Sequence, residues 1–251
     1  MMPAVSGRPL PGYFLSAVLP RRFRGRVCRL CRAPVDGYEY CYRCNAAPDV
    51  VRPDAAGFVS YAIENSQAGQ DMYRYKGMQP SVQAVSNVQL LLEHGLRHLR
   101  CAGRIAGAAV DAVAVMPSRS HYQSGAASQL QKLCALRLPA GLPTVGIEPV
   151  AGATSDRKVD PDSFVVPVLV GWSHVLLIDD TWVSGGTVMS AVGALRTAGA
   201  AKVSSLVLAR WLAPGYRATP ELVREVTEAG GWSPPQGVCP FTRDGVCPRG
   251  R

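Results

Sequence analysis

The sequence lacks any long hydrophobic run, and no apolar stretch approaches the roughly 18 residues that a membrane-spanning helix requires. The N-terminal segment YFLSAVL is too short for that role and also makes a poor signal peptide. Signal peptides carry positive charge before the apolar residues, whereas here the arginines follow them, at positions 21, 22, 24 and 26. We therefore expect a cytoplasmic protein without a membrane partner.

Charged residues are also scarce, at 18% of the chain, whereas hydrophobic residues make up 47%. This balance excludes an intrinsically disordered protein and indicates a folded globular one. The length of 251 residues fits one large domain, or a core of about 200 residues with a small appendage.

Lysine is rare, so the net charge of +9 is carried mainly by arginine. The charge is uneven, because residues 1–52 hold nine arginines against three acidic residues. A basic segment fits a polyanionic partner such as single-stranded DNA, and it fits equally well a charge that only keeps the protein soluble. Both interpretations remain open.

Four of the eight cysteines form a C-x2-C-x9-C-x2-C pattern: Cys28, Cys31, Cys41 and Cys44. Two-residue spacing lets both thiolates of a pair reach one ion, so the pattern predicts a structural Zn²⁺ site, and the turn formers between the pairs suit a small ribbon. A reducing cytosol disfavours disulfides, and the paired spacing favours zinc over an iron–sulfur cluster. Four thiolates around Zn²⁺ add a net charge of about −2, which weakens the case for nucleic acid.

The other cysteines carry weaker signals. Cys101 and Cys134 lie in helix-like stretches and are interpreted as buried apolar residues. Cys239 and Cys247 form a looser pair near the C-terminus. A second metal site, a reversible disulfide and two ordinary thiols in a poorly ordered tail are all compatible with that pair, and the last is preferred.

Strand-like and helix-like segments alternate along the chain, which predicts a mainly parallel α/β sheet covered on both faces. Residues 85–107 carry leucines at helical spacing and are expected to form one long helix. Residues 151–163 are polar and aperiodic, and are expected to form a loop. Strands are expected in the segments FVSYAIEN, AAVDAVAVM, TVGIEPV, VLLIDD and VSSLVLARWL, and further helices over 67–75, 125–137 and 186–199.

The segment VLLIDDTWVSGGT carries the strongest functional signal. A buried strand would deliver Asp179 and Asp180 to its carboxyl end, and the turn Ser184–Thr187 would then open a helix. Free amides at the helix start, two glycines and two hydroxyls suit a phosphate. Paired carboxylates accept hydrogen bonds from vicinal hydroxyls, so the whole segment predicts a ribose 5-phosphate site. The alternative is that Ser184 only caps the helix and the acids only bind water.

This segment resembles the motif of type I phosphoribosyltransferases that binds 5-phosphoribosyl 1-pyrophosphate (PRPP). The resemblance implies a Rossmann-like sheet, with Asp179 and Asp180 on the ribose hydroxyls, Ser184, Gly185, Gly186 and Thr187 around the 5-phosphate, and Mg²⁺ bound with PRPP. The segment AVMPSRSHYQSG resembles the pyrophosphate loop of the same enzymes. The implied pyrophosphate ligands are Pro117, Ser118 and Arg119, together with Arg157 and Lys158 from the family's mobile loop.

With the four-cysteine module and the segment YRYKG, residues 12–212 resemble the ComF family. The resemblance implies an N-terminal helix and zinc-ribbon module over 1–52, a phosphoribosyltransferase-like domain over 53–214 and a C-terminal extension over 215–251. The sequence departs from the family in having TWVSGGT where a threonine pair more often precedes the glycine. It also has HYQSGAASQ where an Arg-Gly-Phe-Asn stretch is usual.

Three functions follow as hypotheses. The first is transfer of the phosphoribosyl group from PRPP to an unidentified small-molecule nitrogen nucleophile, with release of pyrophosphate. Val183 stands where purine-salvage enzymes place an aspartate, and no glutaminase nucleophile opens the chain. The second is a PRPP or nucleotide binder without catalysis. The third is an accessory protein of DNA uptake that contacts single-stranded DNA or a DNA-processing protein. A homodimer is compatible with each.

Overall fold

The structure is a computed structural model that describes residues 8–77, 79–118, 127–150, 158–167 and 171–249. Among the predicted site residues, Arg119 and Arg157 lie outside the described ranges. Within those ranges, none of the helices combines the length and the apolar character needed to cross a membrane.

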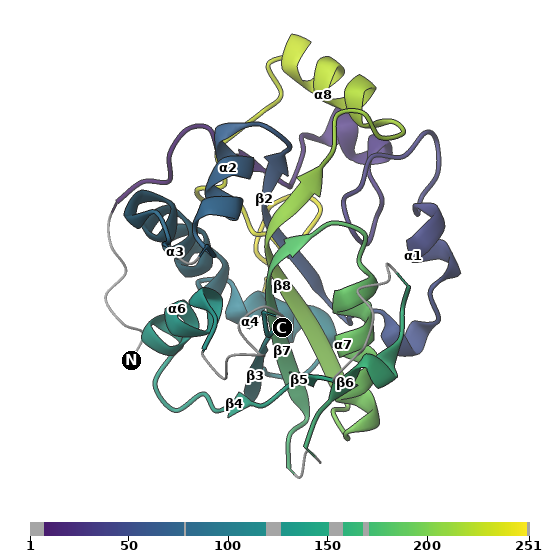
Figure 1. The fold of residues 1–251 in the computed structure, drawn as a ribbon. Helices are drawn as coiled ribbons and strands as arrows, with labels where there is room; N and C mark the ends of the chain where they lie inside the picture. The colour runs from purple at the N-terminus through teal and green to yellow at the C-terminus, as the bar shows by residue number, and fades with distance from the viewer. Residues whose placement is uncertain (1–7, 78, 119–126, 151–157, 168–170, 250–251) are drawn as a thin grey trace.

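A six-stranded sheet forms the centre of the molecule, and its strand order is β1-β2-β8-β7-β3-β4 (Figure 1). Within this sheet only β1 runs antiparallel to its neighbour, and the other described pairs are parallel. The prediction of a mainly parallel α/β sheet is therefore confirmed. The strands are β1 (Leu15–Ser16), β2 (Ala56–Ile63), β3 (Ala112–Val115), β4 (Thr144–Val145), β7 (His174–Trp182) and β8 (Lys202–Leu212).

The sheet is buried on both faces, as alternate residues of β7 show. Val175 and Leu177 pack into one hydrophobic cluster, and Leu176 and Ile178 pack into the other. Helix α7 (Gly186–Thr197) covers the first face, and four helices cover the second (Figure 1). Those four are α2 (Gln67–Arg74), α3 (Val82–Leu96), α4 (Leu99–Ala106) and α6 (Gln129–Arg137).

The expected long helix over 85–107 is wrong, because α3 ends at Leu96 and α4 begins at Leu99. The His98 amide bonds to the carbonyl of Gly95 in a tighter turn, and His98 then becomes the N-cap of α4. The apolar spacing continues through the break, so periodicity alone did not reveal it. The segment expected as one strand at 144–150 also divides, because β5 (Glu148–Pro149) leaves the sheet and pairs with β6 (Phe164–Val165).

The N-terminal module packs on the same face as α7. It holds the 3₁₀ turns η1 (Arg21–Arg26) and η2 (Asp49–Val51) and the short helix α1 (Tyr42–Ala46). The predicted ribbon is not what the described residues form. A single bridge joins Val27 to Pro34, and the second cysteine pair lies on α1 instead of on a strand.

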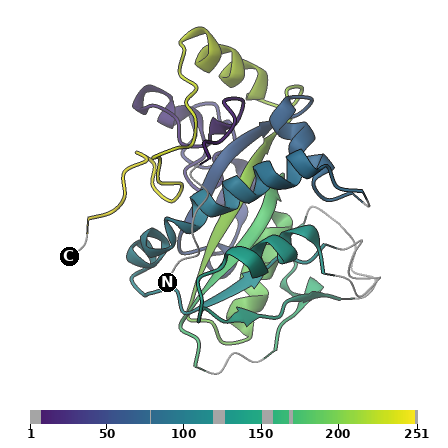
Figure 2. The same ribbon diagram turned by 90° about the vertical axis from the view of Figure 1, so that its left-hand side faces the viewer.

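The C-terminal extension contains α8 (Thr219–Glu228) and then returns to the sheet (Figure 2). The Phe58 amide donates to the carbonyl of Pro240 over 3.2 Å. The Phe241 ring fills the space beside Gly57, where an added Cβ would lie 2.7 Å from it. Cys239 is completely buried, so the prediction of a poorly ordered tail is wrong for this residue.

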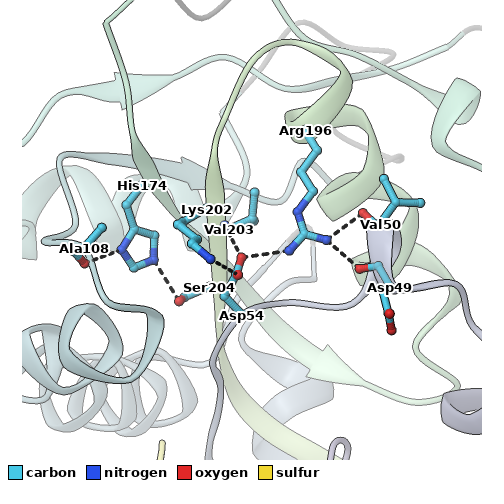
Figure 3. A network of polar contacts seen from close by, with 9 residues as sticks. All are labelled: Asp49, Val50, Asp54, Ala108, His174, Arg196, Lys202, Val203 and Ser204. Atoms are coloured by element: carbon cyan, nitrogen blue, oxygen red, sulfur yellow. Dashed lines mark hydrogen bonds and ion pairs between the residues drawn. The ribbon is translucent and has the colours of Figure 1, made fainter.

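A polar network fixes the amino ends of β7 and β8 (Figure 3). Asp54 accepts hydrogen bonds from Arg196 at 2.7 Å, Lys202 at 3.1 Å and the Val203 amide at 2.9 Å. The buried His174 ring bridges the carbonyl of Ala108 and the hydroxyl of Ser204, each at 2.8 Å. Both ring nitrogens are thereby satisfied, which indicates a structural role at the edge opposite the predicted site.

Candidate functional site

The predicted carboxylates lie at the carboxyl end of the central strand β7. Its neighbour β3 ends in register, with Val115 opposite Ile178. Residues that follow the two strands therefore meet, and a cavity of about 140 Å³ separates them. Carboxyl ends of parallel strands are where open α/β sheets bind ligands. The cavity is lined by Asp179, Asp180, Pro117 and Ser118 from the predicted site, and by Tyr75, Lys76, Met116, Ser128, Gln129 and Leu130.

Two lining residues were not predicted to act at this site. The Lys76 ammonium lies 2.9 and 3.1 Å from the two carboxylate oxygens of Asp180, and the Tyr75 hydroxyl makes a short contact with the same group. The Asp180 side chain is 17% exposed and that of Lys76 is 39% exposed. In the sequence, the segment YRYKG carries only a family resemblance. Lys76 and Asp180 are 104 residues apart, so no local pattern connects them.

The two neighbouring acids differ in their surroundings. Burial, together with the charge of Asp180, raises the pKa of Asp179 to about 8. The Asp180 amide donates to Oδ1 of Asp179 over 2.9 Å. Burial and the adjoining Asp180 also raise the pKa of Tyr75 well above its usual value, so its phenol stays a hydrogen-bond donor. The cavity therefore holds one acid that is protonated at neutral pH beside one paired with Lys76.

The turn after β7 has a specific requirement for glycine at position 185. Gly185 adopts a left-handed φ of +89°, and an added Cβ would lie 2.5 Å from the ring of Trp182. Trp182 is itself 1% exposed and packs edge-on against Phe58, with centroids 5.4 Å apart. The indole therefore supports the turn from the core and does not line the acidic cavity.

The first turn of α7 begins without a side-chain cap. Gly185 is the N-cap and no side chain caps the helix, so the part of the alternative in which Ser184 caps it is wrong. The opening amides of α7, like those of any helix, have no partner within the helix, and here no side-chain cap takes one up, as an anion site at a helix start requires. Gly186 is the first helical residue, and the side chain of Thr187 is exposed beside it.

Ser184 faces a different cavity from the acids. It lines a space of about 340 Å³ between the turn, the end of β8 and the cysteine module. The buried Arg210 of β8 donates to the carbonyls of Trp182 and Val183, at 2.9 and 3.0 Å, and to that of Cys31 at 2.8 Å. One guanidinium thus joins the cysteine module to the turn.

Lys158, the one of the two predicted mobile-loop ligands that the structure describes, is exposed and does not line the acidic cavity. The chain that follows it is held against α7. The Asp160 amide donates to the Ser190 hydroxyl over 2.8 Å, and Pro161 of η3 (Pro161–Ser163) packs on Gly193. The loop therefore returns to the helix whose first turn belongs to the site.

Cys28, Cys31, Cys41 and Cys44 come together as predicted, with all four sulfurs within 4.8 Å of one another. Those of Cys31 and Cys41 are 3.7 Å apart. Two thiolates at 2.3 Å from a tetrahedral zinc lie about 3.8 Å apart, so the arrangement suits this ion. The Cys28 amide donates to the carbonyl of Ala33, which closes the first pair into a tight turn.

The arginines expected to face a polyanion are partly engaged within the protein. Arg26 lies 3.1 Å from Glu225 and 3.5 Å from Glu221 on α8. Arg22 donates to the carbonyl of Ala229 over 2.7 Å. These contacts fasten the N-terminal module to the C-terminal extension, and they reduce the charge available to nucleic acid.

No protein-family model matches the sequence, and no match to it was found among curated proteins.

Proposed function

We propose that this chain is a phosphoribosyltransferase-like protein of the ComF kind, which binds PRPP and transfers its phosphoribosyl group to a nitrogen nucleophile. One observation carries the proposal: Asp179 and Asp180 share a cavity with Pro117 and Ser118 from the neighbouring strand. The uncapped start of α7 follows the acids after five residues. A diol site, an anion site and a second polar loop at one sheet edge match a ribose that carries phosphate at C5 and diphosphate at C1.

In this proposal each group has a separate role. Asp179 and Asp180 accept hydrogen bonds from the ribose hydroxyls, and the first amides of α7 hold the 5-phosphate. Ser118 contacts the diphosphate, with Arg119, Arg157 and Lys158 as its further predicted ligands. Lys76 adds a positive charge at the edge of the cavity. Mg²⁺ bound with PRPP would supply charge neutralisation on the diphosphate.

The reaction is a substitution at C1 of the ribose. The nitrogen lone pair forms the new C–N bond while the C1–O bond breaks, and the bonding electrons leave with the diphosphate oxygen. The nucleophile then loses its proton to solvent or to a basic group. Protein groups mainly position the reactants and stabilise the developing charge.

A second candidate function is PRPP binding without turnover, as in a regulator. The loop after β3 favours it, because HYQSGAASQ lacks the Arg-Gly-Phe-Asn stretch that is usual in the pyrophosphate loop of the ComF family. In that case PRPP would bind, but no diphosphate would be released.

One assay separates the two functions. The full-length protein is incubated with PRPP, Mg²⁺ and a panel of amines and nitrogen bases, and pyrophosphate release is measured alongside PRPP-dependent thermal stabilisation. Release that depends on one acceptor supports the transferase. Stabilisation without release supports the regulator, and the absence of both contradicts a PRPP site.

A further inference from the structure

A second cluster of metal-ligating side chains lies on the opposite face of the sheet from the four-cysteine module. Its members are His98, Cys101, Cys239 and Cys247, whose ligand atoms all lie within 4.8 Å of one another. The sequence left a second metal site open for Cys239 and Cys247 without preferring it, and it did not connect them to His98 and Cys101, because 138 residues separate Cys101 from Cys239. Cys101 and Cys239 are buried, whereas Cys247 is exposed.

The distances within this cluster are those of a tetrahedral metal shell. Nδ1 of His98 lies 3.4 Å from the Cys247 sulfur and 3.9 Å from the Cys101 sulfur. Ligands at 2.0–2.3 Å from a tetrahedral Zn²⁺ are separated by about 3.5–3.8 Å. The four-cysteine module has the same spacing, with 3.7 Å between the sulfurs of Cys31 and Cys41.

Both clusters also use a helix start in the same way. In α1 the ligand pair occupies the N-cap and the third helical residue, Cys41 and Cys44. In α4 the same two positions are held by His98 and Cys101. One helical turn therefore aims two ligands at one point in each case, and the helix break at His98 creates this arrangement.

The remaining two ligands come from a loop that the protein itself holds in position. The Cys239 amide donates to the carbonyl of Gly245 over 2.7 Å, just as the Cys28 amide closes its own turn. Gly245 has a left-handed φ of +73°. Beyond the loop, Arg104 of α4 donates to the carbonyl of Pro248 over 2.6 Å. Both flanks of the loop are thus fixed to the elements around the cluster.

We propose that His98, Cys101, Cys239 and Cys247 bind a second Zn²⁺ ion as a closed structural site. Three thiolates and one neutral imidazole form a complete tetrahedral shell, and soft sulfur ligands favour zinc over Mg²⁺ or Ca²⁺. Each thiol loses its proton on binding, so the site carries a net charge of −1. Arg97 and Arg100 flank His98 in the sequence and offset this charge.

The second zinc ion cross-links the C-terminal segment to α4. That segment also reaches the N-terminal module, since Arg243 donates to the carbonyl of Arg24 over 2.6 Å and Thr242 accepts a bond from Arg32 at 3.4 Å. A continuous series of contacts therefore connects the two metal sites. Loss of the second ion should loosen residues 239–249 and leave the sheet intact.

The test is the zinc content per chain of the full-length protein, purified under reducing conditions without added metal. We expect two equivalents in the wild type and one in Cys247→Ser, whose exposed side chain is the least disruptive of the four to change. Cys28→Ser should lose the other equivalent. Cys134→Ala is the matched control, because this buried cysteine belongs to neither cluster and should keep both ions.

Cobalt substitution supplies a readout that does not depend on zinc counting. The sulfur-to-cobalt charge-transfer absorption should fall by about three sevenths in Cys247→Ser when its whole second site is lost, since the two sites together hold seven thiolates. Unchanged zinc content in Cys247→Ser would overturn the proposal. So would a disulfide among Cys101, Cys239 and Cys247 in protein whose thiols were blocked at lysis.

Discussion

The Lys76 ammonium lies 2.9 Å from a carboxylate oxygen of Asp180, although 104 residues separate the two in sequence. The contact sets one positive charge at the rim of the acidic cavity. If a polyanionic substrate binds there, this charge attracts it, and Lys76→Met should raise the Kd for PRPP about tenfold, equivalent to about 1.4 kcal/mol. Calorimetric titration measures the change. Arg74→Met removes an exposed cation close by and should leave the Kd within twofold.

Asp179 predicts a pH dependence of stability. Its pKa is raised in the folded state, so the protein gains stability from the protonated carboxyl below the unfolded value near 4 and loses that contribution as pH rises through about 8. Asp179→Asn mimics the protonated form. We expect the variant to match the wild type at pH 5 and to melt a few degrees higher at pH 9.

Denaturation of the wild type and of Asp179→Asn between pH 5 and 9 measures how their difference in stability changes with pH. Asp36→Asn, on an exposed loop of the cysteine module, should show no such trend. A wild type that becomes more stable relative to Asp179→Asn as pH rises would contradict the protonated state of this acid.

Gly185→Ala should destabilise the protein by about 2–3 kcal/mol, because it combines a left-handed φ with a Cβ placed 2.5 Å from the Trp182 ring. Urea unfolding measures the loss. Gly215→Ala is the control, since the space around that residue is open and its φ is not left-handed, and it should cost under about 0.5 kcal/mol.

A double variant separates the two causes. Trp182→Phe shortens the ring under the turn, so adding Gly185→Ala to it should cost less than adding Gly185→Ala to the wild type. Equal costs would show that backbone conformation alone requires glycine here.

The contribution of Asp54 to stability should depend on pH in the opposite direction from that of Asp179. Burial opposes its ionisation, but hydrogen bonds from Val203, Arg196 and Lys202 lower its pKa (Figure 3). Its contribution to stability is present above the unfolded value near 4 and disappears as pH falls through the lower folded value. Asp54→Asn should cost about 2 kcal/mol at pH 7 and progressively less in acid.

Asp49→Asn is the comparison for this network, because its carboxylate pairs with Arg52 at the surface. That change should cost under about 1 kcal/mol at pH 7. If Asp54→Asn loses no more stability than Asp49→Asn, the network does not anchor the segment that leads into β2.

Local patterns predicted much of the fold. The apolar run before Asp179 and the glycine turn after it predicted β7 and α7, because both elements depend on neighbouring residues. Four cysteines at regular spacing likewise predicted their own cluster. The requirement for glycine at position 185 was attributed to phosphate binding alone, whereas the Trp182 ring beneath it imposes the same choice.

What the sequence did not reveal depends on contacts between distant residues. Lys76 reaches Asp180, and His98 reaches Cys247, only after the sheet has assembled. The break before α4 falls inside an uninterrupted apolar pattern, so no composition signal marks it. The loop from Cys239 is buried because Phe241 fits beside Gly57, and this match of shapes is invisible before folding.

The most direct test of the central claim is PRPP binding by the wild type and by Asp179→Asn/Asp180→Asn, measured by calorimetry with Mg²⁺ present and with Asp36→Asn as the control. We predict that the wild type and Asp36→Asn bind, and that the double variant folds with the same circular dichroism spectrum but binds at least 100-fold more weakly, a loss of about 2.7 kcal/mol. Equal affinity in the double variant would contradict the assignment of these acids to the ribose.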